Sequence, residues 1–346
     1  MNATYLATWP LRQVTAARRL FAGSWPRLSR PCVSVGNLAF GGRGKTPMAA
    51  ALAKEAAARG LVAAILTRGY LGQVRRKNRP VLLSAVDRVD SPVPWKRGLR
   101  VDAEGGSRPA LSLGFGDEPL WLAANCSDAV IAVHPDRSMA AAAAMEQQDV
   151  DVFILDDGFQ AVIQRDMDLV LLDPQRDPPF RHRAACREGG SSLARAHQLA
   201  LVPQRAGGAP VASIQGDLPV LLRRPTVVRD FHTGLPIAAD QVPPVVVAAA
   251  VGAPSSVTSC AREFGLTVRE TLPIRDHGSP SLSQLRRLSS LKGAALLVTE
   301  KDAFGWAGRM SPLFGTQLLV LSMTLEGSEP LASLLLDRLL GGVSGD

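Results

Sequence analysis

The sequence predicts an α/β fold with a doubly wound, mostly parallel sheet and a second, smaller α/β domain. Short apolar runs of strand length alternate with Ala-rich segments of helix length, as in parallel strands joined by crossover helices. A glycine-rich loop joins the first of these strands to the first helix. The chain has 346 residues, which exceeds the usual size of one domain, and 46% of them are hydrophobic, which is enough for two cores.

The first half of the chain contains the elements of the larger predicted sheet. Its predicted strands cover residues 31–37, 61–67, 129–133, 150–157, 167–173 and 198–204. Its predicted helices cover residues 47–59, 117–125 and 138–148. Residues 72–113 are basic and contain Pro and Gly, so we expect an elaborated loop with a hairpin.

A second set of elements begins at about residue 226. Its predicted strands cover residues 242–252, 294–302 and 317–324. Its predicted helices cover residues 255–265 and 328–340. We therefore expect the second domain to be α/β as well.

Basic charge is concentrated in the first 30 residues. The chain has 39 Lys and Arg residues against 31 Asp and Glu, a net charge of +8. Residues 1–30 contain no acidic residue and supply +5 of this charge through Arg12, Arg18, Arg19, Arg27 and Arg30. Apolar residues recur at helical spacing here, and Trp9 and Trp25 flank the segment. A basic amphipathic helix at an anionic membrane surface fits this pattern, and so does a helix packed on the protein body.

A phosphate-binding loop is the strongest local motif. Residues 39–46, AFGGRGKT, match the Walker A pattern except that Ala39 stands at the first glycine position. Backbone N–H groups of such a loop face phosphate oxygens, Lys45 reaches the β- and γ-phosphates, and Thr46 ligates Mg²⁺. The sequence therefore predicts a P-loop NTPase-type domain, although a glycine-rich turn without a ligand is the alternative. The nucleotide-binding residues are expected to be Gly41, Gly42, Arg43, Gly44, Lys45, Thr46 and Pro47.

Two carboxylates end the predicted strand at residues 150–157. Largely apolar residues precede Asp156 and Asp157, which is the Walker B arrangement. In a P-loop domain such a carboxylate holds Mg²⁺ directly or through water. We therefore expect one or both aspartates to join Thr46 in a magnesium site, with a helix-capping turn as the alternative.

Five short motifs occur in the order found in one enzyme family. They are GGRGKTP at 41–47, TRGY at 67–70, GDEP at 116–119, DDGFQ at 156–160 with RD at 165–166, and TEKDA at 299–303. In this order they resemble the tetraacyldisaccharide 4′-kinase family of lipid A biosynthesis, over residues 5 to about 305. The resemblance implies transfer of the γ-phosphoryl group of ATP to the 4′-hydroxyl of tetraacyldisaccharide 1-phosphate, which gives lipid IVA. ATP and Mg²⁺ are the implied cofactors.

The resemblance also implies a location and a domain organisation. Residues 1–30 resemble the family's membrane-associated segment, which implies a peripheral protein at the cytoplasmic face of the bacterial inner membrane. Residues 31–225 are then the P-loop kinase domain, and residues 226–346 form a C-terminal domain that closes the cleft. The implied partners are the acylated disaccharide phosphate lipid and an anionic membrane surface, with no nucleic acid and no obligate protein partner.

Two residues besides Lys45 are implied as catalytic. Phosphoryl transfer to a sugar hydroxyl requires a group that accepts its proton. Asp117 of GDEP matches the family's acidic residue near the reacting hydroxyl, although an Asp there also suits a helix N-cap. Asp276 and His277 resemble the family's Asp-His-His element, whose His pairs with the catalytic Asp. Gly278 stands where a second His is usual.

Other positions are assigned less directly. Arg68 is expected to bind phosphate or to pair with a Walker B carboxylate, and Arg137 to meet substrate phosphate or to charge a helix start. Glu188 lies in a segment that resembles the family's Leu-Arg-Glu-Pro element, which implies a role in Mg²⁺ binding or as a base. Ala161 stands where the family usually has His. The segment 300–302 of TEKDA is expected to form a structural ion-pair turn.

Other functions fit the sequence less well. A MinD/ParA-like membrane-associated P-loop ATPase switch has a signature Lys where this chain has Phe40, and it leaves GDEP and DDGFQ unexplained. TEKD does not match the guanine-reading NKxD motif of GTPases, and the five His and four Cys do not cluster as metal delivery requires. Aromatic residues make up only 5% of the chain and no nucleic-acid-binding motif is present, so nucleic acid is not expected.

Overall fold

The fold is that of a computed structural model of the whole chain. The residues that the structure describes are 13–15, 17, 19–39, 41–69, 79–85, 99–102, 108–109, 116–177, 180, 186–204, 218–275, 278, 280–289, 293–307 and 317–341. Within these ranges, no helix is both long enough and apolar enough to span a membrane. Their helices are α2 (Lys45–Ala58), α3 (Asp117–Asn125), α4 (Arg137–Gln147), α5 (Pro254–Glu263), α6 (Leu282–Ser289), α7 (Glu300–Asp302) and α9 (Ser328–Gly341).

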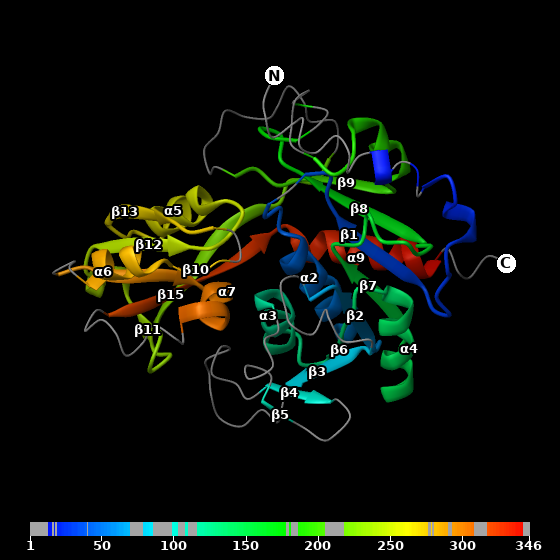
Figure 1. The fold of residues 1–346 in the computed structure, drawn as a ribbon, viewed down its shortest axis with the longest axis horizontal. Coiled ribbons are helices and arrows are strands. Elements are labelled where there is room, and N and C mark those ends of the chain that lie inside the picture. The colour runs from blue at the N-terminus through cyan, green and yellow to red at the C-terminus, as the bar shows by residue number, and fades with distance from the viewer. Residues whose placement is uncertain are drawn as a thin grey trace.

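The larger sheet has the strand order β5-β4-β3-β6-β2-β7-β1-β8-β9 in the described part of the chain (Figure 1). Its strands are β1 (Cys32–Gly36), β2 (Ala63–Thr67), β3 (Val81–Ala85), β4 (Leu99–Asp102), β5 (Arg108–Pro109), β6 (Ala129–Val133), β7 (Val152–Asp156), β8 (Met167–Leu172) and β9 (Gln198–Leu201). The run from β6 to β9 is parallel throughout. The predicted mostly parallel sheet is therefore confirmed.

Helices cover both faces of this sheet. On one face, α2 and α3 pack on a core that includes Ile65 and Ile154. On the other face, α4 packs against Ala64 and Phe153. Because successive side chains of a strand point to opposite faces, neighbours such as Ala64 and Ile65 contact different helices. Both faces are buried, which is why these strands are continuous apolar runs in the sequence and are predictable from it.

An antiparallel extension forms one edge of the larger sheet. β3 pairs antiparallel with both β6 and β4, and β4 pairs antiparallel with β5. These strands lie in the basic segment 72–113 that joins β2 to α3 along the chain. The hairpin predicted there is confirmed for the strands that the structure describes.

The second sheet has the strand order β11-β10-β15-β14-β12-β13, again for the described residues. Its strands are β10 (Leu222–Asp230), β11 (Pro236–Ile237), β12 (Val245–Ala249), β13 (Val268–Pro273), β14 (Ala295–Thr299) and β15 (Leu318–Glu326). The run from β13 through β12 and β14 to β15 is parallel, whereas β10 is antiparallel to β15 and β11. β10 crosses the predicted boundary at residues 225 and 226, and the domain division stays a prediction.

Three strands of the second sheet, β10, β11 and β13, and the helix α6 were not predicted. β10 has the sequence LRRPTVVRD and is mostly half-buried, so it contains no apolar run. Pro225 also interrupts it, and the pairing with β15 shifts in register between Pro225 and Val227. β13, with the sequence VRETLP, is an edge strand with charged residues and lacks the same signal.

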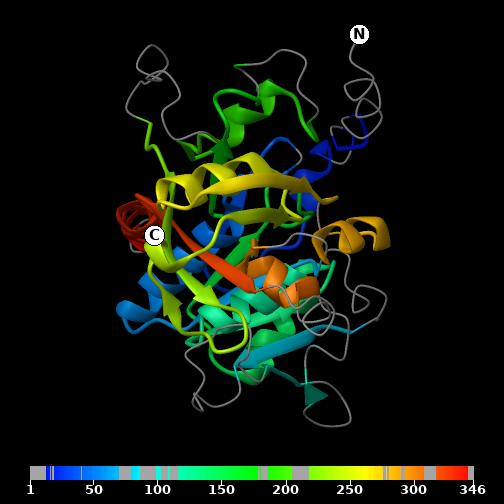
Figure 2. The ribbon, with the colours of Figure 1, turned by 90° about the vertical axis from the view of Figure 1, so that its left-hand side faces the viewer.

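The C-terminal helix α9 returns from the second sheet to the first (Figures 1 and 2). Leu335 and Leu336 of α9 belong to the same core cluster as Leu52 of α2. At the end of α2, Arg59 Nη1 lies 2.6 Å from Asp337 Oδ1. The chain therefore passes between the sheets twice, once before β10 and once before α9, which holds the second sheet beside the P-loop region.

Strand β14 ends earlier than predicted. The chain turns there into the helix α7, which lies at the site. The predicted strand continues to residue 302, but β14 ends at Thr299 because a capping box begins α7 there. Thr299 Oγ1 accepts a hydrogen bond from the backbone N–H of Asp302, and the Asp302 carboxylate accepts one from the backbone N–H of Thr299. The turn places α7 beside α3, as the two views show (Figures 1 and 2).

Candidate active site

The P-loop connects β1 to α2. Gly41 and Gly44 have φ angles of 98° and 80°, a conformation that glycine adopts without the strain that a side chain would cause. Gly44 is the N-cap of α2, so Lys45 and Thr46 are the first two helical residues, two positions earlier than predicted. A glycine N-cap has no side chain to accept from the first-turn N–H groups, which leaves them available for an anion.

The side chains of Lys45 and Thr46 contact residues at the ends of β1 and β7. Lys45 Nζ lies 3.3 Å from Asn37 Oδ1 and 3.5 Å from Asp157 Oδ1. Thr46 Oγ1 lies 3.3 Å from Asp156 Oδ2. β1 and β7 are adjacent parallel strands, so their carboxyl ends meet at one edge of the sheet. The structure thus brings the P-loop and the Walker B pair together.

The two aspartates have different environments. Burial and the charge of Glu118 raise the pKa of Asp156 to about 7, although the charge of Lys301 opposes the shift. Its Oδ1 atom is buried and has no hydrogen-bond partner. Burial also acts on Asp157, but the charges of Arg187 and Lys45 overcome it and hold the pKa well below its usual value. Asp157 is therefore a stable anion, whereas Asp156 has an oxygen free for a ligand.

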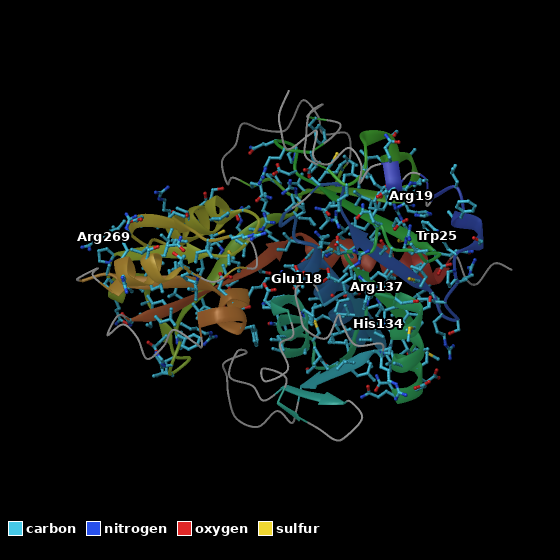
Figure 3. All side chains as sticks on the ribbon, in the orientation of Figure 1. Arg19, Trp25, Glu118, His134, Arg137 and Arg269 are labelled. Atoms are coloured by element: carbon cyan, nitrogen blue, oxygen red, sulfur yellow. The ribbon has the colours of Figure 1, made fainter. Side chains whose placement is uncertain are left out.

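A lysine from the second sheet completes this region. Lys301 Nζ lies 3.0 Å from Glu118 Oε1 and 3.4 Å from Thr46 Oγ1. Burial alone lowers the pKa of Lys301, but the carboxylates of Glu118, Asp117 and Asp156 raise it well above its ordinary value. Figure 3 shows Glu118 near the middle of the molecule, close to where α2, α3 and α7 meet. Sequence reasoning missed both Glu118 and Lys301, although both belong to motifs, GDEP and TEKDA, that it had singled out.

Asp117 is the first residue of α3 rather than its cap. The N-cap is Gly116, so the alternative of an Asp N-cap does not describe this helix. The charge of Asp117 acts on Lys301 and on Asp302, which places its carboxylate on the α7 side of α3. A hydrogen bond between Trp121 Nε1 and Glu300 Oε2, 2.7 Å long, links the same two helices.

The predicted partner of Asp117, His277, lies outside the described residues, as does Asp276. Gly278 is described, and its backbone N–H donates to the carbonyl oxygen of Arg275 over 2.7 Å. A Cβ at Gly278 would lie 2.7 Å from that same oxygen. The turn is therefore closed too tightly for the second His that the family usually has, unless the backbone moves.

Arg187 and Glu188 are neighbours in sequence but contact different groups. Arg187 forms two hydrogen bonds of 2.8 Å to Asp157 and also donates to Asn37 Oδ1, so it lies next to Lys45. Glu188 is buried, and its two carboxylate oxygens accept from Arg19, Arg195 and Gln160. These donors occupy the oxygens that the sequence had assigned to Mg²⁺ or to proton transfer, and Glu188 is not brought to Thr46.

The N-terminal segment is joined to this cluster through Arg19. The guanidinium of Arg19 lies over the rings of Trp25 and Phe159, 5.5 Å and 5.4 Å from their centroids. Trp25 is buried, whereas Leu20 and Phe21 are 83% and 69% exposed. In the view of Figure 3, Arg19 and Trp25 lie on the side away from the second sheet. One part of the segment thus packs on the protein body and another presents apolar side chains to solvent.

The side chain of Arg43 forms a buried ion pair with Asp177. The neighbouring carbonyl oxygen of Gly42 accepts from Gln204 Nε2 over 3.2 Å and from Arg223 Nη2 over 3.1 Å. Arg223 belongs to β10 of the second sheet, so the P-loop is anchored to both sheets. Of the predicted nucleotide-binding residues, Arg43 therefore offers its backbone N–H rather than its guanidinium.

Arg137 and Arg68 both interact with the Walker B aspartates. Arg137 is the first residue of α4 and is only 4% exposed, and its Nη2 donates to the carbonyl oxygen of Asp156 over 3.2 Å. Burial and the charge of Arg68 lower the pKa of Arg137 to about 10. Arg68 follows β2, and its charge also acts on Asp157. Arg137 thus holds the end of β7, as a buried charge at a helix start, in the position that Figure 3 shows.

A cleft with an empty volume of about 760 Å³ opens between the P-loop and the second sheet. Gly42, Gly44 and Lys301 line its polar end, and Val257 and Leu321 belong to its apolar wall. The first-turn N–H groups of α2, the carboxylates and the cleft together form a site that can hold a phosphorylated ligand and a hard cation side by side.

The sequence model of one protein family matches most of this chain. The sequence model of the tetraacyldisaccharide-1-P 4′-kinase family matches residues 2–91 and 97–340. A tetraacyldisaccharide 4′-kinase from Geobacter sulfurreducens is 30% identical, over 95% of this chain and 89% of its own length. One from Geobacter metallireducens is 31% identical, over 88% of this chain and 87% of its own length.

A solved structure supports the fold. LpxK from Aquifex aeolicus, crystallised in complex with ATP, aligns with a TM-score of 0.61 at 22% identity over 96% of each chain. None of these matches supports a MinD/ParA-like switch. The family model covers nearly the whole chain, including every motif quoted above, and the chain therefore belongs to the tetraacyldisaccharide-1-P 4′-kinase family.

Proposed function

We propose that the protein transfers the γ-phosphoryl group of ATP to the 4′-hydroxyl of a tetraacyldisaccharide 1-phosphate, with lipid IVA as the product. Family membership supports the reaction, since relatives over most of the chain are named for it. The single observation that carries it in the structure is the contact between Thr46 and Asp156, which joins a P-loop to a strand-end carboxylate.

The phosphates of ATP would bind at the N-terminus of α2. The uncapped N–H groups of the first turn and the positive end of the helix dipole favour an anion there. Lys45 belongs to this turn, and the present partners of its ammonium, Asn37 and Asp157, are 3.3 and 3.5 Å away. Arg187 keeps Asp157 neutralised, so Lys45 is free to exchange that contact for phosphate oxygens.

The residues around Thr46 suit Mg²⁺. A hydroxyl, the buried Asp156 carboxylate with its unpartnered oxygen, and the Glu118 carboxylate are all hard oxygen donors. Mg²⁺ in such sites is held by one or two carboxylates, and substrate phosphates and water complete its coordination. When bound, Mg²⁺ neutralises charge on the transferring phosphoryl group.

Asp117 is the proposed proton acceptor for the sugar hydroxyl. It lies one residue before Glu118, on the side of α3 that faces α7, where its charge acts on Lys301. A carboxylate is the kind of group that accepts the proton of a sugar hydroxyl as phosphoryl transfer proceeds. The pairing of His277 with Asp117 stays a prediction.

Membrane association is proposed for the N-terminal segment. Among the residues described there, Val14, Leu20 and Phe21 are exposed apolar side chains, while Arg27 and Arg30 form ion pairs with Asp166 and Asp149. An exposed apolar surface of this kind suits the headgroup region of a bilayer, where the acylated substrate is also found. The proposed location is the cytoplasmic face of the bacterial inner membrane, where ATP is available.

Radioactive phosphate transfer tests the proposed reaction. Purified protein, γ-labelled ATP, Mg²⁺ and a detergent-dispersed tetraacyldisaccharide 1-phosphate should give a labelled lipid. Lys45→Ala should reduce the rate by roughly a hundredfold or more because it removes charge stabilisation of the transferring group. Lys54→Ala, which removes an exposed lysine of the same helix, should not. Equal rates for both variants would contradict the proposed role of the P-loop.

A further inference from the structure

Lys301 reaches from the second sheet to the P-loop. It follows β14 as the second residue of α7, yet its ammonium lies 3.0 Å from Glu118 Oε1 on α3. The same nitrogen lies 3.4 Å from Thr46 Oγ1 on α2. One side chain therefore contacts a carboxylate and a hydroxyl that belong to two different helices of the first sheet, near the labelled Glu118 in Figure 3.

The oxygen atoms around this ammonium are the ones that the proposed cation site uses. Thr46 Oγ1, which Lys301 contacts, is also 3.3 Å from Asp156 Oδ2. Asp156 is 1% exposed, and its other oxygen has no hydrogen-bond partner. A buried carboxylate oxygen without a donor is unfavourable unless a further ligand approaches it. These oxygens therefore favour a positively charged ligand, and the ammonium of Lys301 lies next to them.

The two lysines near the P-loop have separate anionic partners. Lys45 contacts Asn37 and Asp157, on the side where Arg187 lies. Lys301 contacts Glu118 and Thr46 instead. The positive charge at the Thr46 and Glu118 oxygens therefore comes from the second sheet and not from the P-loop itself.

We infer, on the basis of the proposed kinase function, that Lys301 competes with the divalent cation for these oxygens. An ammonium at 3.0 Å and 3.4 Å from Glu118 and Thr46 uses the lone pairs that Mg²⁺ needs, and two cations repel each other strongly at such short range. A divalent cation must displace the ammonium before it binds both oxygens. Lys301 is thus a competing cation supplied by the protein.

Displacement favours a cation that arrives with nucleotide. The displaced ammonium stays attached to α7, which lines the same cleft as Gly42 and Gly44 of the P-loop. Phosphate oxygens in that cleft give it a new anionic partner, whereas a bare cation leaves it only the charge of Asp117 nearby. Lys301 therefore weakens the binding of free Mg²⁺ more than the binding of the Mg²⁺ complex of a nucleotide.

Binding of Mn²⁺ alone tests this inference. The full-length protein, freed of nucleotide and metal with a chelator, is titrated with Mn²⁺, and free Mn²⁺ is followed by electron paramagnetic resonance. Lys301→Met should lower the Kd for Mn²⁺ by about tenfold or more, because a like charge leaves the site. Lys54→Met, which removes an exposed lysine of α2, should leave the Kd within about twofold of wild type. An unchanged or raised Kd in Lys301→Met would overturn the inference.

Two further variants guard against a misfolded or repacked protein. Lys301→Gln removes the charge but keeps a polar side chain, and its circular dichroism should match wild type; it should also bind Mn²⁺ more tightly. Adding Glu118→Gln to Lys301→Met should abolish the gain, and a gain that persists would contradict the site. The titration uses neither lipid nor ATP. Failure of lipid phosphorylation with tighter Mn²⁺ binding would therefore count against the proposed reaction and not against the competition.

Discussion

Arg43 and Asp177 form a doubly hydrogen-bonded ion pair that is almost fully excluded from solvent. Arg43 Nε lies 2.8 Å from Asp177 Oδ2 and Nη2 lies 2.7 Å from Oδ1, and the two side chains are 1% and 0% exposed. Arg43 is a P-loop residue, and Asp177 follows β8 on the far side of β1. The pair therefore fixes the loop between Gly42 and Gly44 to the sheet.

Breaking this pair should destabilise the protein strongly. Arg43→Met leaves the Asp177 carboxylate buried without its partner, which should lower the free energy of unfolding by about 3–5 kcal/mol. Chemical denaturation followed by circular dichroism measures the change. The double variant Arg43→Met with Asp177→Leu removes both charges and should recover most of the loss. If Arg43→Met alone costs less than about 1 kcal/mol, the pair does not hold the loop.

The buried carboxyl group of Asp302 should make stability depend on pH. Burial raises its pKa from 3.8 to about 6, although hydrogen bonds from Thr299 and Ala250 oppose the shift. The folded protein therefore holds this proton more tightly than the unfolded chain, so the stabilisation is complete below about pH 4 and is lost as the pH rises through about 6.

Asp302→Asn should remove this dependence, because an amide keeps an acceptor for the Thr299 N–H but does not ionise. The difference in unfolding free energy between variant and wild type should change in favour of the variant by roughly 3 kcal/mol from pH 4 to pH 7. Urea denaturation at a series of pH values measures it. Parallel curves for the two proteins would show that Asp302 does not carry the shift.

Gly252, in the loop after β12, should be essential for the shape of the P-loop. A Cβ there would lie 2.2 Å from the Gly42 backbone nitrogen and 2.5 Å from Gly41 Cα, distances that require the backbone to move. Gly252→Ala should therefore weaken binding of ATP analogues, by roughly tenfold or more, because the N–H groups lose their alignment. Gly341→Ala, where a Cβ meets nothing within 4 Å, is the matched control. Calorimetric titration would refute this account if both variants bound equally.

The exposed apolar residues of the N-terminal segment should mediate lipid binding. Leu20→Ser with Phe21→Ser removes side chains that are 83% and 69% exposed, so stability should change little. Cosedimentation with anionic liposomes should fall several-fold. Met139→Ser, which alters an apolar side chain of α4 that is 40% exposed, serves as the control. Equal sedimentation of all three proteins would place the membrane contact elsewhere.

Local signals made the P-loop and the Walker B pair predictable. Gly44, Lys45 and Thr46 are consecutive, and Asp156 ends a strand that is buried on both faces, so each motif can be recognised from its neighbouring residues. β10 was missed because its half-exposed side chains and Pro225 leave no apolar run. Its role as the connection between the sheets is a property of topology, which periodicity does not contain.

Contacts between residues far apart in the chain could not be predicted from the sequence. Lys301 is 255 positions from Thr46, and Asp177 is 134 positions from Arg43. The residues around Lys301 and Arg43 therefore do not indicate which residues these side chains contact. The motifs did mark the right segments, since Glu118 belongs to GDEP and Lys301 to TEKDA. The partners of Glu188, Arg19 and Arg195, are likewise not indicated by the sequence around it, and its role in Mg²⁺ binding or as a base stays a prediction.

The most direct test of the central claim is the position of the transferred phosphate. Wild-type protein and Asp117→Asn are incubated with ATP, Mg²⁺ and tetraacyldisaccharide 1-phosphate, and the lipid is analysed by mass spectrometry and phosphorus NMR. We expect wild type to give a lipid with one added phosphate at the 4′-position, and Asp117→Asn to slow its formation by about a hundredfold. A phosphate at another hydroxyl, or no lipid product while ATP is consumed, would contradict the proposed function.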